Sequence, residues 1–157
     1  TDETTVEALR DYGRDYYREH CTTGLTQVYA GIPPLLRGLT GRGIALGMVT
    51  NKTEATARRI MAHYFPDVQF RFIWGNNGVR PLKPATESGE LMLRELGLEA
   101  RQIAFIGDGD TDMAFASKMG FWALGACWGY RPREVLAEHG ADVLLASADE
   151  LKKLLLG

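Results

Sequence analysis

The segment Ile103-Ala-Phe-Ile-Gly-Asp-Gly-Asp-Thr-Asp112 joins a short apolar run to a cluster of acidic residues. The run over 103–106 is too short for a helix and shows no polar alternation, which is typical of a strand buried on both faces of a parallel sheet. Ligands bind at the carboxyl ends of such strands. The polar residues that follow the run are therefore candidates for a functional site.

The same pattern of an apolar run followed by polar residues recurs along the chain. Further strands are predicted over 44–49 and 121–127, with weaker candidates at 68–74 and 142–145. Helical spacing of apolar residues lies between them, over 53–64, 85–97, 112–119 and 132–139, and Ser147 opens a last helix. This alternation predicts an α/β layered fold with a parallel sheet. The first 27 residues differ, because they read as one helix followed by a linker.

The composition is that of one folded domain. The chain has 157 residues, 45% of them hydrophobic and 24% charged, and a formal net charge of -2 at pH 7. A mildly acidic chain without a Lys/Arg run favours no nucleic-acid partner, and no apolar run approaches the roughly 20 residues of a membrane helix. The two cysteines form no disulfide framework and the N-terminus is not a signal peptide, so we expect a cytoplasmic location. A homo-oligomer is compatible with the sequence, which does not specify the oligomeric state.

Three acidic residues, Asp108, Asp110 and Asp112, follow the apolar run at alternate positions. Carboxylates this close repel one another unless a positive charge lies among them, and a hard divalent cation such as Mg²⁺ is the natural partner. The alternative is that Asp108 or Asp110 caps a helix while Asp112 is solvated. The residues alone leave both interpretations open.

Two other polar groups also allow both a functional and a purely structural interpretation. Thr50 and Asn51 follow a predicted strand, where they could bind an anion at a helix N-terminus or simply cap the helix over 53–64. Lys83 lies in a proline-containing loop, and a lone lysine in a loop is most often a solvated surface charge.

In their order along the chain, these groups resemble the motifs of the haloacid dehalogenase superfamily, close to its phosphoglycolate phosphatase branch. The second family motif, a strand ending in a hydroxyl residue, is similar to Gly47-Met-Val-Thr-Asn-Lys52. The third, a lysine usually followed by proline, is similar to Lys83-Pro84, and the fourth, Gly-Asp with a second Asp four residues later, is similar to 107–112. The resemblance runs from about residue 28 to the C-terminus and implies a three-layer, Rossmann-like parallel sheet.

The resemblance also implies an activity, the Mg²⁺-dependent hydrolysis of a small phosphorylated metabolite through an aspartyl-phosphate. Thr50 and Lys83 are then the catalytic candidates. Thr50, Asn51 and Lys83 would bind the phosphate, and Lys83 would also offset charge on the nucleophile. Asp108 would bind Mg²⁺, with Asp112 supporting the metal site or orienting the lysine. Positioning and charge neutralisation are what phosphoryl transfer requires.

One motif of the family has no counterpart in this sequence. Family members carry the nucleophile and the acid/base as an Asp-x-Asp pair that ends the first strand, whereas Asp2, Asp11 and Asp15 lie in or beside the predicted first helix. Residues 1–27 resemble the tail of a helical cap, and 28–157 resemble the core without its first strand. We therefore expect the chain alone to be inactive, and two buried strands to lack a ladder partner.

The missing nucleophile leaves an alternative, a non-catalytic binding or interaction module on a reduced scaffold of the same family. Such a module could bind Mg²⁺ or phosphate without turnover, or complete its sheet with a second chain. Phosphatase, dehalogenase and phosphomutase chemistry are not distinguished either, because that choice depends on the first motif and the cap. Phosphoglycolate as the substrate follows only from the resemblance to one branch.

Overall fold

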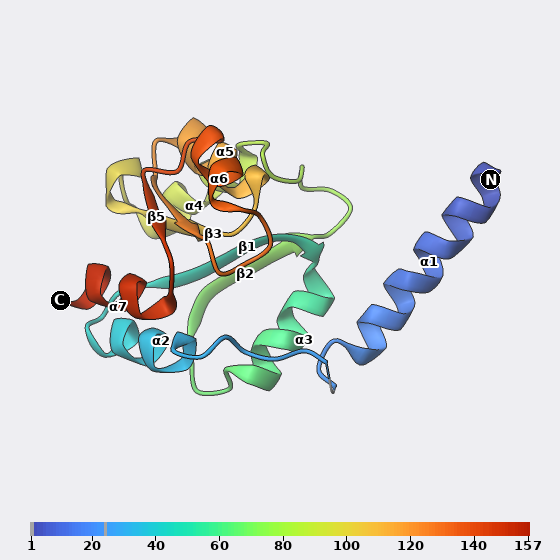
Figure 1. Ribbon diagram of the computed structural model, residues 1–157, viewed down its shortest axis with the longest axis horizontal. Coiled ribbons are helices and arrows are strands. Elements are labelled where there is room, and N and C mark those ends of the chain that lie inside the picture. The colour runs from blue at the N-terminus through green and yellow to red at the C-terminus, as the bar shows by residue number, and fades with distance from the viewer. Residues whose placement is uncertain (1, 24) are drawn as a thin grey trace.

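The computed structural model describes residues 2–23 and 25–157 (Figure 1). In chain order the elements are α1 (Glu3–His20), α2 (Ile32–Gly41), β1 (Leu46–Thr53), α3 (Glu54–Tyr64), β2 (Phe70–Asn76), α4 (Glu87–Leu96), the 3-10 helix η1 (Ala100–Gln102), β3 (Ala104–Gly107), α5 (Asp110–Met119), β4 (Trp122–Ala126), α6 (Arg133–Glu138), β5 (Val143–Leu145) and α7 (Ala148–Leu156). All the strand pairs are parallel. The alternation of strands and helices and the parallel pairing confirm the predicted fold class.

Two hydrophobic cores lie on opposite faces of the strands. Successive residues of a strand point to opposite faces, and in β3 Phe105 belongs to one core while Ala104 packs against the other. The same alternation holds in β4 for Ala123 and Leu124. Helices α4, α5 and α6 complete the first core, and α2 and α7 complete the second (Figure 1). The strands therefore lie between two helical layers, as the three-layer expectation requires.

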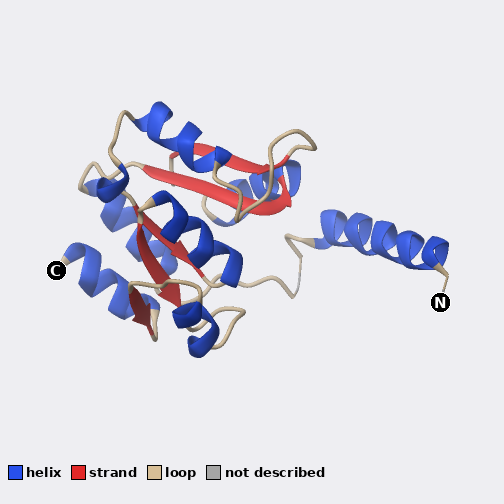
Figure 2. Cartoon of the chain, turned by 90° about the horizontal axis from the view of Figure 1, so that it is seen from above, coloured by secondary structure: helices blue, strands red, loops and turns tan. Residues whose placement is uncertain are grey.

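The strands form two separate sheets instead of one. In the part of the chain that the structure describes, β1 pairs only with β2, while β3, β4 and β5 form a three-stranded sheet in that order. Figure 2 shows the two groups of strands as separate sheets. Among the described residues, β1 and β3 each have a ladder partner on one side only. That the core lacks a first strand stays a prediction.

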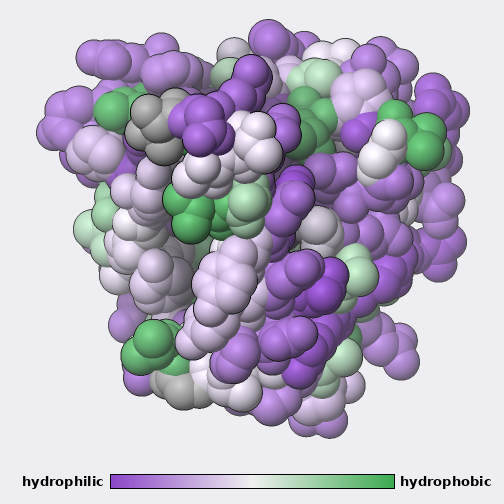
Figure 3. Space-filling view, turned by 90° about the vertical axis from the view of Figure 1, so that its right-hand side faces the viewer, coloured by the Kyte–Doolittle hydropathy of each residue, from purple (hydrophilic) through white to green (hydrophobic). Residues whose placement is uncertain are grey.

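Helix α1 stands apart from the rest of the chain (Figures 1 and 2). None of its residues is buried, and its N-cap is Asp2, whose side chain accepts a hydrogen bond from the Thr5 amide at 2.7 Å. Its end is tied to the core where the Arg59 guanidinium donates to the Arg18 carbonyl at 3.0 Å. The face of the molecule that carries α1 is mainly hydrophilic, with apolar residues scattered over it (Figure 3). That residues 1–27 belong to a helical cap stays a prediction.

The structure adds one helix that the sequence pattern did not reveal and corrects one alternative. Helix α2 has a proline in its first turn and buries Leu35 and Leu39. Strand β1 continues to Thr53, which is the N-cap of α3. Thr50 and Asn51 therefore do not cap that helix, so the capping interpretation of these two residues is wrong. Across the described part of the chain, no helix has both the length and the apolar character needed to cross a membrane.

Candidate active site

Lys83 connects β1 of one sheet to the helix that follows β3 of the other. Its Nζ atom donates to the Val49 carbonyl of β1 at 2.7 Å and to Oδ1 of Asp112 at 2.5 Å. Asp112 lies in the first turn of α5, directly after β3. The ammonium also lies 5.2 Å from the centroid of the Phe105 ring. The side chain of Lys83 is only 8% exposed and that of Asp112 13%, so the surface-charge interpretation of Lys83 is wrong.

Both carboxylate oxygens of Asp112 accept a hydrogen bond. Oδ1 accepts from Lys83, and Oδ2 accepts from the Gly109 amide at 3.0 Å, which satisfies one of the free N–H groups at the start of α5. Gly107 makes room for this side chain, because a Cβ atom there would lie 2.3 Å from Cβ of Asp112. Asp112 is therefore neither solvated nor free, and its contacts orient Lys83.

The backbone of the Lys83 loop is fixed by a side chain 32 residues earlier in the chain. The Asn51 amide nitrogen donates to the Lys83 carbonyl at 3.0 Å, and the Asn51 amide oxygen accepts from the Lys83 N–H at 2.9 Å. Sequence reasoning assigned Asn51 to phosphate and missed this bridge, for which the only signal was a side-chain amide in the motif next to Thr50. The Thr50 hydroxyl accepts from the Lys52 amide at 3.2 Å, and its own proton has no recorded acceptor among the described residues.

Asp108 is held by the loop that follows β4. Its Oδ2 atom accepts from the Tyr130 amide at 3.0 Å, and its backbone carbonyl accepts from the Arg131 amide at 3.0 Å. A Cβ atom at Gly129 would lie 2.3 Å from Cβ of Asp108, so this glycine lets the loop approach. No hydrogen bond within the described residues reaches Oδ1 of Asp108, which leaves one carboxylate oxygen for a ligand.

Asp110 takes part in a different interaction from its two neighbours. Its Oδ1 atom accepts from Nε of Arg131 at 2.9 Å. This hydrogen bond from the guanidinium holds the pKa of the Asp110 carboxyl below its ordinary value. The three carboxylates of the acidic cluster thus have three different partners: a loop backbone, an arginine and a lysine.

The side chains that could act as metal ligands test whether this site can hold the expected Mg²⁺ ion. Within residues 2–23 and 25–157, no group of three or more His, Cys, Asp or Glu side chains is arranged to hold a metal ion. Mg²⁺ keeps several waters and is often bound by only one or two carboxylates, so Asp108 with its free oxygen fits such an ion. Asp112 fits less well as a ligand, since Lys83 and Gly109 already occupy both of its oxygens.

A second cluster holds the loop that carries Lys83. The Glu54 carboxylate accepts from Arg58 at 2.9 Å and from the Gly75 amide at 3.3 Å, and it lies 3.6 Å from Arg80. Arg80 in turn donates to the Gly75 carbonyl at 3.2 Å. The Arg58 hydrogen bond is the main reason that the pKa of Glu54 lies below its ordinary value. This cluster joins the start of α3 to the end of β2, and sequence reasoning did not find it.

Comparison with known proteins identifies relatives along almost the whole chain. The chain is 33% identical over 151 residues to the N-acetylmuramic acid 6-phosphate phosphatase of Pseudomonas aeruginosa, spanning 96% of this chain and 66% of the relative. It is 30% identical over 149 residues to the phosphoglycolate phosphatase of Salmonella typhi, spanning 95% of this chain and 59% of the relative. The chain therefore spans roughly three fifths to two thirds of the length of these curated relatives.

The fold has solved counterparts as well. A crystal structure from Lactobacillus delbrueckii subsp. bulgaricus, of a protein proposed to be a phosphoglycolate phosphatase, superimposes with a TM-score of 0.89 at 28% identity. The match covers 99% of this chain and 64% of that one. The family model of the haloacid dehalogenase-like hydrolases matches residues 1–126. The chain belongs to the haloacid dehalogenase-like hydrolase family.

Proposed function

We propose that these residues are the larger part of a phosphomonoester hydrolase of the phosphoglycolate phosphatase-like kind, which acts on a small phosphorylated metabolite. The observation that carries the proposal is the position of Lys83, a nearly buried ammonium held between the Val49 carbonyl of β1 and Asp112, which follows β3 in the first turn of α5. Asp108, with one free oxygen, lies at the same edge of the fold. The relatives named above are phosphatases of N-acetylmuramic acid 6-phosphate and of phosphoglycolate.

Each residue of the site has a defined task in this proposal. The Lys83 ammonium neutralises charge on the phosphoryl oxygens, and the hydroxyl of Thr50 donates to one of them. Asn51 holds the Lys83 loop in place through its two hydrogen bonds. Asp108 would hold Mg²⁺, which supplies further neutralisation of the phosphate charge when bound. Asp112 is a positioning residue, because it acts through Lys83.

The nucleophile of this proposal lies outside the described site. In the reaction expected from the family, an aspartate oxygen bonds to phosphorus while the bond to the leaving oxygen breaks, and water then hydrolyses the aspartyl-phosphate. Asp2, Asp11 and Asp15 lie at or in the exposed helix α1, and their recorded partners are Thr5, Arg14 and Arg18 of the same helix. We therefore propose that a segment outside these 157 residues supplies the aspartate, and that the chain alone binds phosphate without turnover.

Binding of inorganic phosphate to this chain tests the first half of the proposal. Titration with Mg²⁺ present, followed by heteronuclear NMR, should show saturable binding at the amides around Thr50 and Lys83. Lys83→Met should weaken it at least tenfold, and Asp108→Asn should remove its dependence on Mg²⁺. Lys118→Met is the matched control, because this exposed lysine contacts the same loop through the Pro84 carbonyl at 3.4 Å. Phosphate binding that is indifferent to Lys83 would overturn the proposed site.

A chimera tests turnover. Residues 1–157 would replace the matching part of the Pseudomonas aeruginosa N-acetylmuramic acid 6-phosphate phosphatase, whose remaining third is then present in the same polypeptide. We expect the folded chimera to hydrolyse phosphomonoesters with Mg²⁺, and the Lys83→Met and Asp108→Asn chimeras to lose this activity. A folded but inactive chimera, or full activity without Lys83, would contradict the hydrolase proposal.

A further inference from the structure

The loop that follows β4 contacts the residue that follows β3. We call residues 127–131 the β4 loop. The amide of Tyr130 donates to Oδ2 of Asp108 at 3.0 Å, and the amide of Arg131 donates to the Asp108 carbonyl at 3.0 Å. The first hydrogen bond fixes the side chain of Asp108 and the second fixes its main chain. The β4 loop therefore sets the direction of Oδ1, the oxygen without a recorded hydrogen bond among the described residues.

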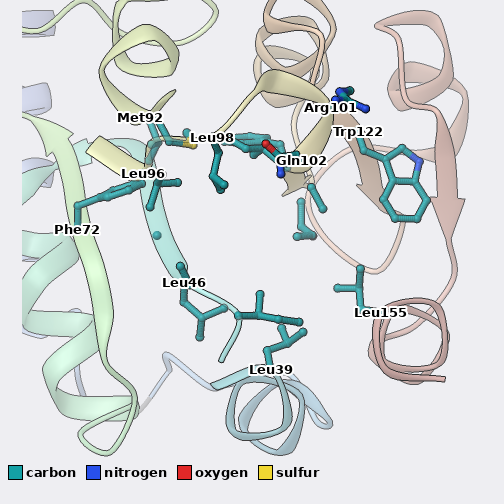
Figure 4. Close-up of a pocket in the computed structure, with 18 residues that line it drawn as sticks. Leu39, Leu46, Phe72, Met92, Leu96, Leu98, Arg101, Gln102, Trp122 and Leu155 are labelled. Atoms are coloured by element: carbon teal, nitrogen blue, oxygen red, sulfur yellow. The ribbon is translucent and has the colours of Figure 1, made fainter. Parts of the chain in front are cut away.

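The other edge of β3 gives Asp108 no comparable support. An apolar cavity of about 540 Å³ lies there, and Leu46 and Phe72 line it from the opposite sheet (Figure 4). In the described part of the chain, none of the residues that line this cavity is a recorded hydrogen-bond partner of Asp108. The position of the carboxylate therefore depends on what holds the β4 loop in place.

The side chain of Arg131 ties the β4 loop to helix α5. Its Nε atom donates to Oδ1 of Asp110, in the first turn of α5, at 2.9 Å. Its guanidinium carbon lies 4.7 Å from the centre of the Tyr130 ring, so the same group also contacts its neighbour in the loop. At the other end of the loop, the Cys127 amide donates to the Leu145 carbonyl of β5 at 2.9 Å. Arg131 thus links the loop to the acidic cluster, whereas Cys127 links it to the sheet.

The ion pair of Asp110 and Arg131 is too exposed to matter much for the stability of the fold. The side chain of Arg131 is 40% exposed and that of Asp110 32%, and pairs exposed to this degree contribute little to stability. Its contribution is geometric, because it joins the segment that carries Asp108 to the segment that carries the two amides. Groups that orient a metal ligand typically change metal affinity by about 10-fold to 100-fold when they are removed.

We propose that Arg131 is a positioning residue for Mg²⁺: through its hydrogen bond to Asp110 it holds the β4 loop against Asp108, and so keeps Oδ1 of that carboxylate available to the ion. The inference rests on the proposed function, in which Asp108 holds Mg²⁺. It deepens that proposal, because it makes a loop outside the acidic cluster a determinant of Mg²⁺ affinity.

Two neutral replacements separate the hydrogen bond from the charge. In Arg131→Gln the side-chain amide nitrogen lies as many bonds from the backbone as Nε of arginine, so it can donate to Asp110 in place of Nε. Arg131→Met has no donor at this position. Both variants lose a positive charge near a dication, a change that by itself tightens Mg²⁺ binding. We expect Arg131→Met to bind Mg²⁺ about tenfold more weakly than the wild type, and Arg131→Gln to bind it at least as tightly as the wild type.

Arg133→Met is the matched control. Arg133 is an exposed arginine two residues further along the chain, and it donates to the Leu144 carbonyl at 3.5 Å instead of to the acidic cluster. Exposed charges are screened by salt, so at physiological ionic strength this variant should bind Mg²⁺ within about twofold of the wild type. It separates the effect of Arg131 from that of removing any arginine from this part of the chain.

The measurement is a Mg²⁺ titration of the chain of 157 residues, followed by NMR at the amides of Asp108 and Gly109. Hydrogen exchange reports the loop itself: in Arg131→Met the amides of residues 130 and 131 should exchange about tenfold faster, while that of Cys127 keeps its rate. Wild-type or tighter Mg²⁺ binding by Arg131→Met, or equal affinities of Arg131→Met and Arg131→Gln, would overturn the positioning role and leave Asp108 as the ligand. A wild-type chain without saturable Mg²⁺ binding would overturn the assignment of Asp108 and this inference together.

Discussion

Replacing Lys83 should reveal how strongly the ion pair couples the two sheets. Lys83→Met leaves Asp112 nearly buried without its cation, and breaking one partner of a buried pair costs about 3–5 kcal/mol. Asp112 keeps the Gly109 amide and is 13% exposed, so we place the loss of unfolding free energy at the lower end, about 3 kcal/mol. Asp112→Asn keeps the size of the side chain and removes its charge, for which we expect about 2 kcal/mol.

The double variant decides whether the pair acts as a unit. Lys83→Met with Asp112→Asn should cost about 3 kcal/mol, which gives a coupling energy of about 2 kcal/mol. Urea unfolding with linear extrapolation measures each value, provided that the slope of the free energy against urea is unchanged. Lys118→Met, a change at an exposed lysine, should stay within about 0.5 kcal/mol. Additive single changes, or a Lys83 variant as stable as the Lys118 variant, would refute the reasoning.

Three further predictions follow from particular contacts. Gly129→Ala should displace Asp108, whose Cβ would lie 2.3 Å from the new methyl group, with a loss of about 1–3 kcal/mol in urea unfolding and at least tenfold weaker Mg²⁺ binding by calorimetry. Gly13→Ala, in α1 with open space around it, should instead raise helicity by circular dichroism, equivalent to about 0.5–1 kcal/mol. Glu54 has a folded pKa below its unfolded value, so its stabilisation is present above the unfolded pKa and is lost as pH falls through the folded pKa. The stability difference between wild type and Glu54→Gln should therefore shrink on acidification, and a constant difference would contradict the role of the Arg58 hydrogen bond.

The strands β3 and β4 were the most predictable, because each is a short apolar run with no helical alternative. The run over 103–106 became β3 at 104–107, and that over 121–127 became β4 at 122–126, within the usual uncertainty of element ends. Helix α2 escaped notice because its second and third residues are prolines, which interrupt most helices but suit a first turn. Its buried face, Leu35 and Leu39, has only one helical repeat and gives too short a pattern to recognise.

The contacts of the site were less predictable than its residues. Lys83 in isolation has the sequence of a surface loop, and its burial arises only when β1 and α5 meet around it. The Asn51 bridge spans 32 residues, so its existence depends on the path of the chain between them. Likewise, Gly107 and Gly129 matter because of the side chains that approach them, Asp112 and Asp108, and not because of their own backbone angles. Each of these contacts forms only when segments that are distant in the sequence come together, so the local sequence pattern could not predict them.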